Sequence, residues 1–235
     1  MNKQRPVYPI TIKQEREVKR ITFASTIRDM ISAFDLDHGL LFTLRLLFTR
    51  PGYLVSFYLG EGRVKVFNVF RLLLVTTAVC LFLMGITGLE DFWISASLDT
   101  GNEEAVEKVQ RLVIDWYNLF LWAGIPVYAL FSYLFHRKAG YNYAEHIVMQ
   151  TFNICAANLL TLFWLWLAST FGANWMLGLL FGFSMSYYIW LVATWIGQYT
   201  VIAFLKYITS YLLATLVYIV LMSMVAAGIY SGISS

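Results

Sequence analysis

Cysteine, histidine and charged residues are all scarce in this chain of 235 residues. Only two cysteines and three histidines occur, and Asp, Glu, Lys and Arg together make up 13% of the sequence. Because Cys80 and Cys155 both lie inside apolar stretches, we expect neither a disulfide framework nor a CxxC metal site. The three histidines also lack the HExxH and nucleophile-elbow patterns of metalloproteases and serine hydrolases. We therefore predict no catalytic residue, no metal and no cofactor.

A signal-peptide pattern is also missing at the N-terminus. Residues 1–20 are polar and charged and contain two prolines, whereas a secretory signal has a short basic stretch followed at once by an apolar run. We therefore expect no cleaved signal, and 1–20 is interpreted as a polar N-terminal tail.

Apolar residues, in contrast, are abundant: they make up 59% of the chain, and aromatic residues alone make up 17%. This composition is too apolar for an ordinary soluble domain. A helix that crosses about 30 Å of hydrocarbon needs about 20 apolar residues. The sequence thus predicts an all-α membrane protein with a transmembrane domain over 66–235. Five stretches meet the length requirement: 69–89, 112–135, 147–168, 175–196 and 207–230.

The charges are distributed unequally between the two sides of these stretches. Fifteen of the 17 Lys and Arg residues fall on one side, and six acids between Glu90 and Glu107 fall on the other. Cytoplasmic segments of membrane proteins are enriched in Lys and Arg. The pattern predicts a cytoplasmic N-terminus and an external C-terminus. It also accounts for the net charge of +3, so we expect no nucleic-acid partner.

The stretch 40–60 is apolar but is not expected to span the membrane. Arg45 and Arg50 would each cost about 2.5–3.5 kcal/mol near a bilayer centre, and Pro51 breaks a helix. Two short helices on the inner leaflet are favoured, as part of a collar of amphipathic interfacial helices over 21–65. Apolar residues recur at helical spacing at the start of this collar, at Phe23, Ile27, Met30, Ile31 and Phe34.

Few polar groups lie inside the predicted spans. Arg71 is one turn from the cytoplasmic end of the first span and is expected to reach the headgroups. Asp115 and Asn118, near the outer end of the second span, could line a vestibule or form a solvated helix start. Three amides in the third span could bond between helices or line a polar path. They are Gln150, Asn153 and Asn158.

Two further patterns have a structural and a functional interpretation. Gly178 and Gly182 form a GxxxG pair, which suits close helix packing either within the chain, the favoured reading, or between copies. Glu145 and His146 combine metal-ligand types, but neighbouring side chains on a helix diverge by about 100°, which argues against a shared ion.

Two stretches carry a denser pattern: DLDHGLLFTLRLLFTRPGYLVSFYLGEGRVKVFNVFRLLL and YNYAEHIV. Together they resemble an uncharacterised family of bacterial multi-pass membrane proteins, a domain of unknown function with an rPg...GxR motif and an nyaEH motif. The resemblance covers about residue 22 through the third span, and it implies a multi-pass protein of the bacterial inner membrane without an assigned activity. The matching positions are Asp37, Gly39, Thr43, Arg50, Pro51, Gly52, Tyr58, Gly60 or Gly62, Arg63, Asn142, Tyr143, Glu145 and His146.

The chain departs from this family in two places. It lacks the N-terminal zinc-ribbon cysteines of many relatives, and a proline expected near Asn68 and Val69 is absent. The first departure argues against a role for a metal or a ribbon-mediated partner.

The collar residues suggest how the collar is held. Arg50 and Arg63 are expected at the inner interface, where anionic lipids attract each by about 1 kcal/mol. We predict that Glu145 pairs with one of these arginines or with Arg71 and so docks the collar on the bundle.

Three functions are compatible with the pattern. The favoured one is a non-enzymatic membrane module that works by self-assembly or by binding lipids or a membrane protein partner. The alternative is a homo-oligomeric channel or small transporter, with a pore lined by amides, hydroxyls and backbone. A membrane enzyme acting on lipids would need a cleft that joins Asp37, Glu145 and His146.

Overall fold

The computed structural model describes residues 39–88, 116–171 and 175–234, and every element in these ranges is a helix. The expected tail 1–20 and the expected amphipathic helix before residue 39 lie outside the described residues. The elements are α2 (Gly39–Thr49), α3 (Pro51–Leu59), the short 3-10 helix η1 (Glu61–Val64), α4 (Val69–Thr87), α7 (Tyr117–Phe135), the 3-10 helix η2 (Arg137–Ala139), α8 (Tyr143–Phe171), α9 (Trp175–Ile196) and α10 (Val201–Ser234).

Four described helices are long and apolar enough to cross a membrane. They cover Val69–Thr87, Tyr143–Phe171, Leu179–Ile196 and Val201–Val225. The remaining predicted span, 112–135, corresponds to α7, whose apolar part Phe120–Phe135 is shorter than the other four. The chain is thus an all-helical protein with four apolar candidate spans among the described residues.

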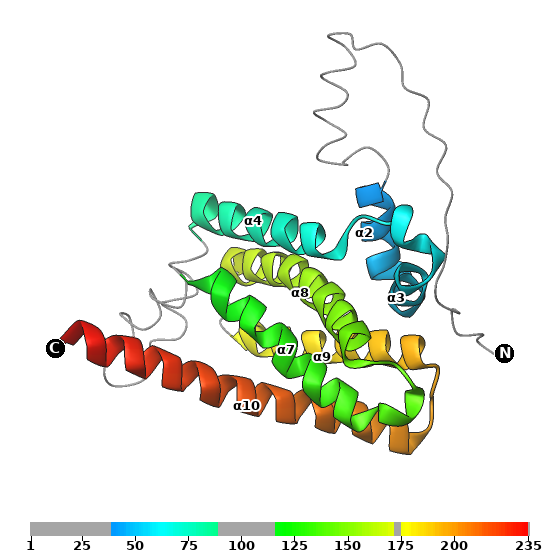
Figure 1. Ribbon diagram of the computed structural model, residues 1–235. Helices are drawn as coiled ribbons and strands as arrows, with labels where there is room; N and C mark the ends of the chain where they lie inside the picture. The colour runs from blue at the N-terminus through cyan, green and yellow to red at the C-terminus, as the bar shows by residue number, and fades with distance from the viewer. Residues whose placement is uncertain (1–38, 89–115, 172–174, 235) are drawn as a thin grey trace, which may run out of the picture.

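The long helices form a closed ring with one helix outside it. Helices α7, α8, α9 and α10 each pack against two of the others, and α4 packs along the outer side of α8 (Figure 1). The start of α4, the end of α7, the start of α8, the end of α9 and the start of α10 all lie at the end of the bundle next to α2 and α3 (Figure 1). Successive long helices therefore run in opposite directions.

Local capping explains where two of these helices begin. The Asn68 side chain accepts hydrogen bonds from the backbone N–H groups of Phe70 and Arg71 at 3.0 and 3.3 Å. At α8, the Asn142 side chain accepts from the backbone N–H of Glu145, whose carboxylate accepts from the N–H of Asn142. Both arrangements satisfy N–H groups that a helix start leaves without partners. Asn68 thus caps α4 near the position where the family resemblance leads one to expect a proline.

The segment 40–60 breaks before Pro51, as its sequence predicts, but α3 is buried rather than lying on the surface. Leu54 and Val55 are completely buried, and α3 packs against α9 and α8. A Cβ atom at Gly52 would overlap the backbone of Thr194 and Trp195, so the missing side chain allows α3 and α9 to approach closely.

The position of the predicted collar on the inner leaflet stays a prediction, and the packing adds a contact with the bundle. The described part of the predicted collar, 39–65, contributes its second helix to the core of the bundle, because nearly every side of α3 is apolar. Arg45 and Arg50 remain exposed at the edge.

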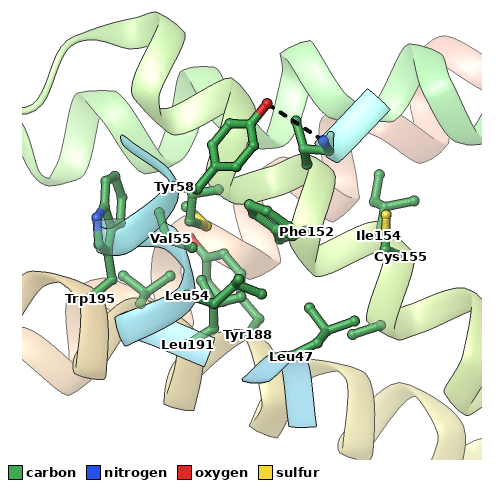
Figure 2. Close-up of a cluster of buried hydrophobic side chains, with 14 of the residues drawn as sticks. Leu47, Leu54, Val55, Tyr58, Phe152, Ile154, Cys155, Tyr188, Leu191 and Trp195 are labelled. Atoms are coloured by element: carbon green, nitrogen blue, oxygen red, sulfur yellow. Dashed lines mark hydrogen bonds between the residues drawn. The ribbon is translucent and has the colours of Figure 1, made fainter. Parts of the chain in front are cut away.

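The largest buried cluster joins the short helices α2 and α3 to α8 and α9, as Figure 2 shows. Tyr58 of α3 meets Phe152 of α8 edge to face, with ring centroids 5.4 Å apart. The Tyr187 hydroxyl donates a 2.8 Å hydrogen bond to the carbonyl of Leu47. Both free cysteines are buried, and Cys155 lies in this cluster as a small packing residue.

Candidate functional site

A cavity of about 160 Å³ lies inside the ring formed by α7, α8, α9 and α10. Each of the four helices contributes to its wall, and none of the described residues that line it is charged. The lining residues are Leu121, Gly124, Tyr128, Asn153, Ile154, Ala157, Leu160, Ser184, Tyr187, Tyr211 and Tyr218.

Four tyrosines give this cavity an aromatic wall. The Tyr128 ring lies 5.6 Å from that of Tyr211 and 6.0 Å from that of Tyr218. The Tyr128 hydroxyl bonds to Thr215 at 2.9 Å, and the Tyr218 hydroxyl donates to the carbonyl of Phe120 at 2.9 Å. Because Thr215 and Phe120 do not line the cavity, these two tyrosines offer it mainly their rings.

Asn153 and Ser184 supply polar side chains to the wall. The Asn153 amide donates to the Gln150 side chain at 3.3 Å, and the Gln150 amide donates to the backbone carbonyl of Tyr128 at 3.4 Å. These bonds tie α8 to α7 and hold Asn153 at the cavity. The site therefore combines a mostly apolar wall with a few oriented polar groups, as small-molecule sites usually do.

The three amides that the sequence singled out do not form one path. Gln150 and Asn153 lie inside the ring, whereas Asn158 donates to the Thr77 hydroxyl at 3.1 Å and so joins α8 to α4. Interhelical hydrogen bonding, the more common use of such amides, explains Gln150 and Asn158. Asp115 lies outside the described residues, and the side chain of Asn118 is not described.

A cluster of three polar residues lies at the end of the ring next to α3. The Ser132 carbonyl accepts a 2.8 Å hydrogen bond from His136 Nδ1, and the Ser132 hydroxyl is 2.9 Å from His146 Nδ1. Both histidines are buried, and the Nε2 atom of each has no hydrogen-bond partner among the described residues. The Ser132 link holds α7 and α8 together at this end.

The electrostatics of His136 follow from its position after α7. Burial is the largest effect, and it lowers the pKa of this imidazole. The hydrogen bond to the Ser132 carbonyl raises the pKa, and the nearby Lys206 ammonium lowers it. His136 is therefore neutral near pH 7. Since Nδ1 carries its proton, the buried Nε2 presents an unshared electron pair.

His146 does not share a surface site with Glu145, contrary to its predicted place in collar docking. Its ring is completely buried and lies 5.0 Å from the ring of Trp195. Glu145 is partly exposed and caps α8 through Asn142. The two side chains diverge because they are adjacent on a helix. The cleft that a lipid-active enzyme would need is not formed by these two residues, and Asp37 lies outside the described ones.

The predicted arginine partners of Glu145 separate into different places. Arg63 lines the same surface hollow as Glu145 and Asn142, with its guanidinium 5.6 Å from the centre of the Tyr58 ring. Arg50 lines another hollow, and Arg71 is exposed on the first turn of α4. Of the three arginines, Arg63 is the one that the fold brings near Glu145, whose carboxylate is hydrogen-bonded to the N-terminus of its own helix.

Gly182 has free space beside it in the described structure. A Cβ atom at this position would meet nothing within 4 Å, so this glycine does not mediate a close contact within the described chain. Gly178 lies in the part of α9 whose side-chain surroundings are not described. Both uses of the GxxxG pair, within the chain and between copies, therefore stay predictions.

The cavity tyrosines, Ser184 and Ser132 were not recognised as site residues in the sequence. Tyrosine and serine are common in membrane helices, and no spacing distinguishes those that face the ring from those that face lipid.

Comparisons with family models, with curated proteins and with solved structures found no match for this chain. Membership of the uncharacterised membrane family is therefore a proposal that rests on the quoted motif residues.

Proposed function

We propose that this chain is a non-enzymatic membrane module whose ring of four helices binds the apolar part of a membrane lipid or a small neutral amphiphile. The observation that carries this proposal is the uncharged, aromatic cavity between the four helices. An apolar cavity of about 150 Å³ holds a molecule such as benzene. The volume here suits one ring of that size or a short part of an acyl chain.

The membrane arrangement that we propose has five spans, formed by α4, α7, α8, α9 and α10. Their alternating directions and their shared ends support it (Figure 1). Basic residues of the connections lie at the end next to α3, where Arg137 and Lys138 form η2 and Lys206 lies in the first turns of α10. This end is the cytoplasmic one by the positive-inside bias, so the C-terminus is external. The family resemblance is what supports a bacterial inner membrane.

The proposal is tested with a phospholipid that carries a diazirine near the end of an acyl chain. The full chain is reconstituted with this lipid in nanodiscs and illuminated, and labelled residues are identified by mass spectrometry. Asn153 and Tyr211 are almost completely buried, so a lipid that only surrounds the protein does not reach them. We expect label on both residues.

Two variants make the result specific to the cavity. Ala157→Phe adds a ring at the cavity wall and should strongly reduce labelling of Asn153 and Tyr211. Leu216→Phe adds the same ring on the exposed side of α10 and should leave the labelling unchanged. Unlabelled Asn153 and Tyr211 in the original chain, or equal effects of the two variants, would refute lipid binding in the cavity.

A homo-oligomeric channel or small transporter is the alternative, and the open face at Gly182 is the observation that favours self-assembly. Mass determination in nanodiscs distinguishes one copy from several. Ion or solute flux in liposomes that follows a multimeric mass would favour the alternative over lipid binding by a single chain.

A further inference from the structure

A second hollow, of about 270 Å³, lies where the break between α2 and α3 meets α9. It is separate from the central cavity, because the two share no lining residue. Among the described residues of its wall, Arg50 alone is charged. The lining residues are Thr49, Arg50, Tyr53, Ser56, Trp190 and Thr194.

The position of these residues along α9 places the hollow near the inner membrane boundary. Thr194 and Trp190 precede the end of the helix at Ile196 by two and six residues. At 1.5 Å per residue they lie about 3 and 9 Å from that end. Because this is the proposed cytoplasmic end, the hollow extends from the headgroup level to the upper hydrocarbon, where tryptophan and tyrosine are common.

Arg50 is the cationic group in this wall. The aliphatic hydroxyls already donate to carbonyls of their own helices: Thr49 to Arg45, Ser56 to Gly52, and Thr194 to Trp190. A guanidinium presents N–H groups in a planar fork that matches the oxygens of a phosphate. Within the described ranges, no carboxylate lines the hollow to compete for it.

The backbone holds Arg50 in place. Its N–H donates to the carbonyl of Leu46 at 2.8 Å, and its carbonyl accepts from Leu54 at 3.0 Å. Two residues later, Gly52 lies against the backbone of Thr194 and Trp195 on α9. The backbone from which the arginine side chain extends is therefore fixed, so binding does not have to order it.

We propose that this hollow binds one anionic phospholipid of the inner leaflet, with its phosphate on the Arg50 guanidinium and an acyl chain beside Trp190. Arg50 supplies the attraction for the anion, and Tyr53 and Trp190 supply apolar area for the upper part of the chain. The inference rests on the orientation proposed above but not on ligand binding in the central cavity.

The test uses the purified full chain in detergent, with phosphatidylglycerol, phosphatidylcholine or inorganic phosphate added as separate probes, and native mass spectrometry to count retained ligands. We expect one phosphatidylglycerol molecule to be retained in preference to phosphatidylcholine. Arg50→Gln should weaken this retention by about fivefold or more, since an arginine at an anionic surface contributes on that scale.

Arg71→Gln is the matched control, because Arg71 is also exposed near this end of the bundle but does not line the hollow. Equal losses in the two variants would show diffuse surface charge and overturn the proposal. Retention of inorganic phosphate with the same dependence on Arg50 would identify a free-phosphate site and overturn the lipid assignment.

Two checks keep the outcome interpretable. Arg50→Lys keeps the charge but not the planar fork and should weaken lipid retention less than Arg50→Gln does. If Arg50→Lys loses as much lipid as Arg50→Gln and its unfolding temperature is also lowered, the effect is due to folding and the proposal is contradicted. Photolabelling of Asn153 should be unchanged in Arg50→Gln. Failure of the Arg50 lipid site and failure of the cavity proposal can therefore be distinguished.

Discussion

His136 shows how a single residue couples this fold to pH. Its imidazole is buried between the end of α7 and α10, where its ring centroid lies 5.0 Å from that of Tyr207. Burial and the Lys206 charge disfavour the protonated form, so the pKa of His136 is lowered from its usual value near 6.5. The folded protein therefore binds fewer protons at this residue than the unfolded chain.

We predict that the thermal stability of the protein in detergent falls between pH 7.5 and pH 5.5. The contribution of His136 is complete above about pH 6.5 and is lost as the pH falls toward the lowered pKa, with a slope of at most about 1.4 kcal/mol per pH unit for one proton. His136→Gln removes the titrating group and should make the unfolding temperature less dependent on pH. An unchanged dependence in this variant would show that other groups cause the effect.

At the scale of helices, α4 is the long helix that lies outside the ring. It packs along α8, outside the ring, and the Asn158 amide bonds to the Thr77 hydroxyl across this contact (Figure 1). Lipid tails are as apolar as leucine, so the association of membrane helices relies on packing and on such hydrogen bonds. This bond is therefore expected to contribute to holding α4 in place.

We predict a measurable coupling between Asn158 and Thr77. Asn158→Leu and Thr77→Val should each lower the free energy of unfolding, and the double variant should lose less than the sum, with a coupling of about 0.6 kcal/mol and at most about 1.7 kcal/mol. Denaturant unfolding in mixed micelles gives the four values. Thr76→Val is the control, because the Thr76 hydroxyl donates to Leu72 of its own helix. Coupling of equal size with Thr76 would argue against the specific bond.

For the whole molecule, the number of spans decides on which side the C-terminus lies. Four candidate spans are long and apolar, and α7 is the element whose crossing decides between an even and an odd count. Helix α7 packs against both α8 and α10, which supports its inclusion as a fifth span.

We predict that alkaline phosphatase fused after residue 235 is active when the chain is produced in bacteria, and that green fluorescent protein at the same place stays dark. Fusions within η2 should give the opposite pair of results, because this connection is placed in the cytoplasm. A fluorescent C-terminal fusion together with inactive phosphatase would show an even number of spans.

Several features of the fold could be predicted from local sequence. Pro51 breaks 40–60 into two helices, and the first long apolar stretch becomes a helix that begins at Val69. These features depend on backbone chemistry and on apolar length, both of which are properties of a short segment. Cys80 and Cys155 lie inside such apolar segments, and both are buried.

The candidate sites depend on contacts between distant parts of the chain. Nothing local to α3 indicates that Gly52 meets α9, and nothing local to α8 indicates that His146 is buried while Glu145 is not. In a membrane protein the lipid-facing and core-facing sides of a helix are equally apolar, so periodicity does not separate them. The tyrosines of the cavity were missed for this reason.

The sequence by itself determined that this chain is helical and apolar enough for a membrane, because length and hydropathy are properties of each segment alone. Only the tertiary structure decided which polar groups bond between helices, which line a cavity and where Arg50 lies. Those outcomes depend on how helices with similar apolar surfaces pack, and the packing is set by close approaches such as that of Gly52 to Thr194.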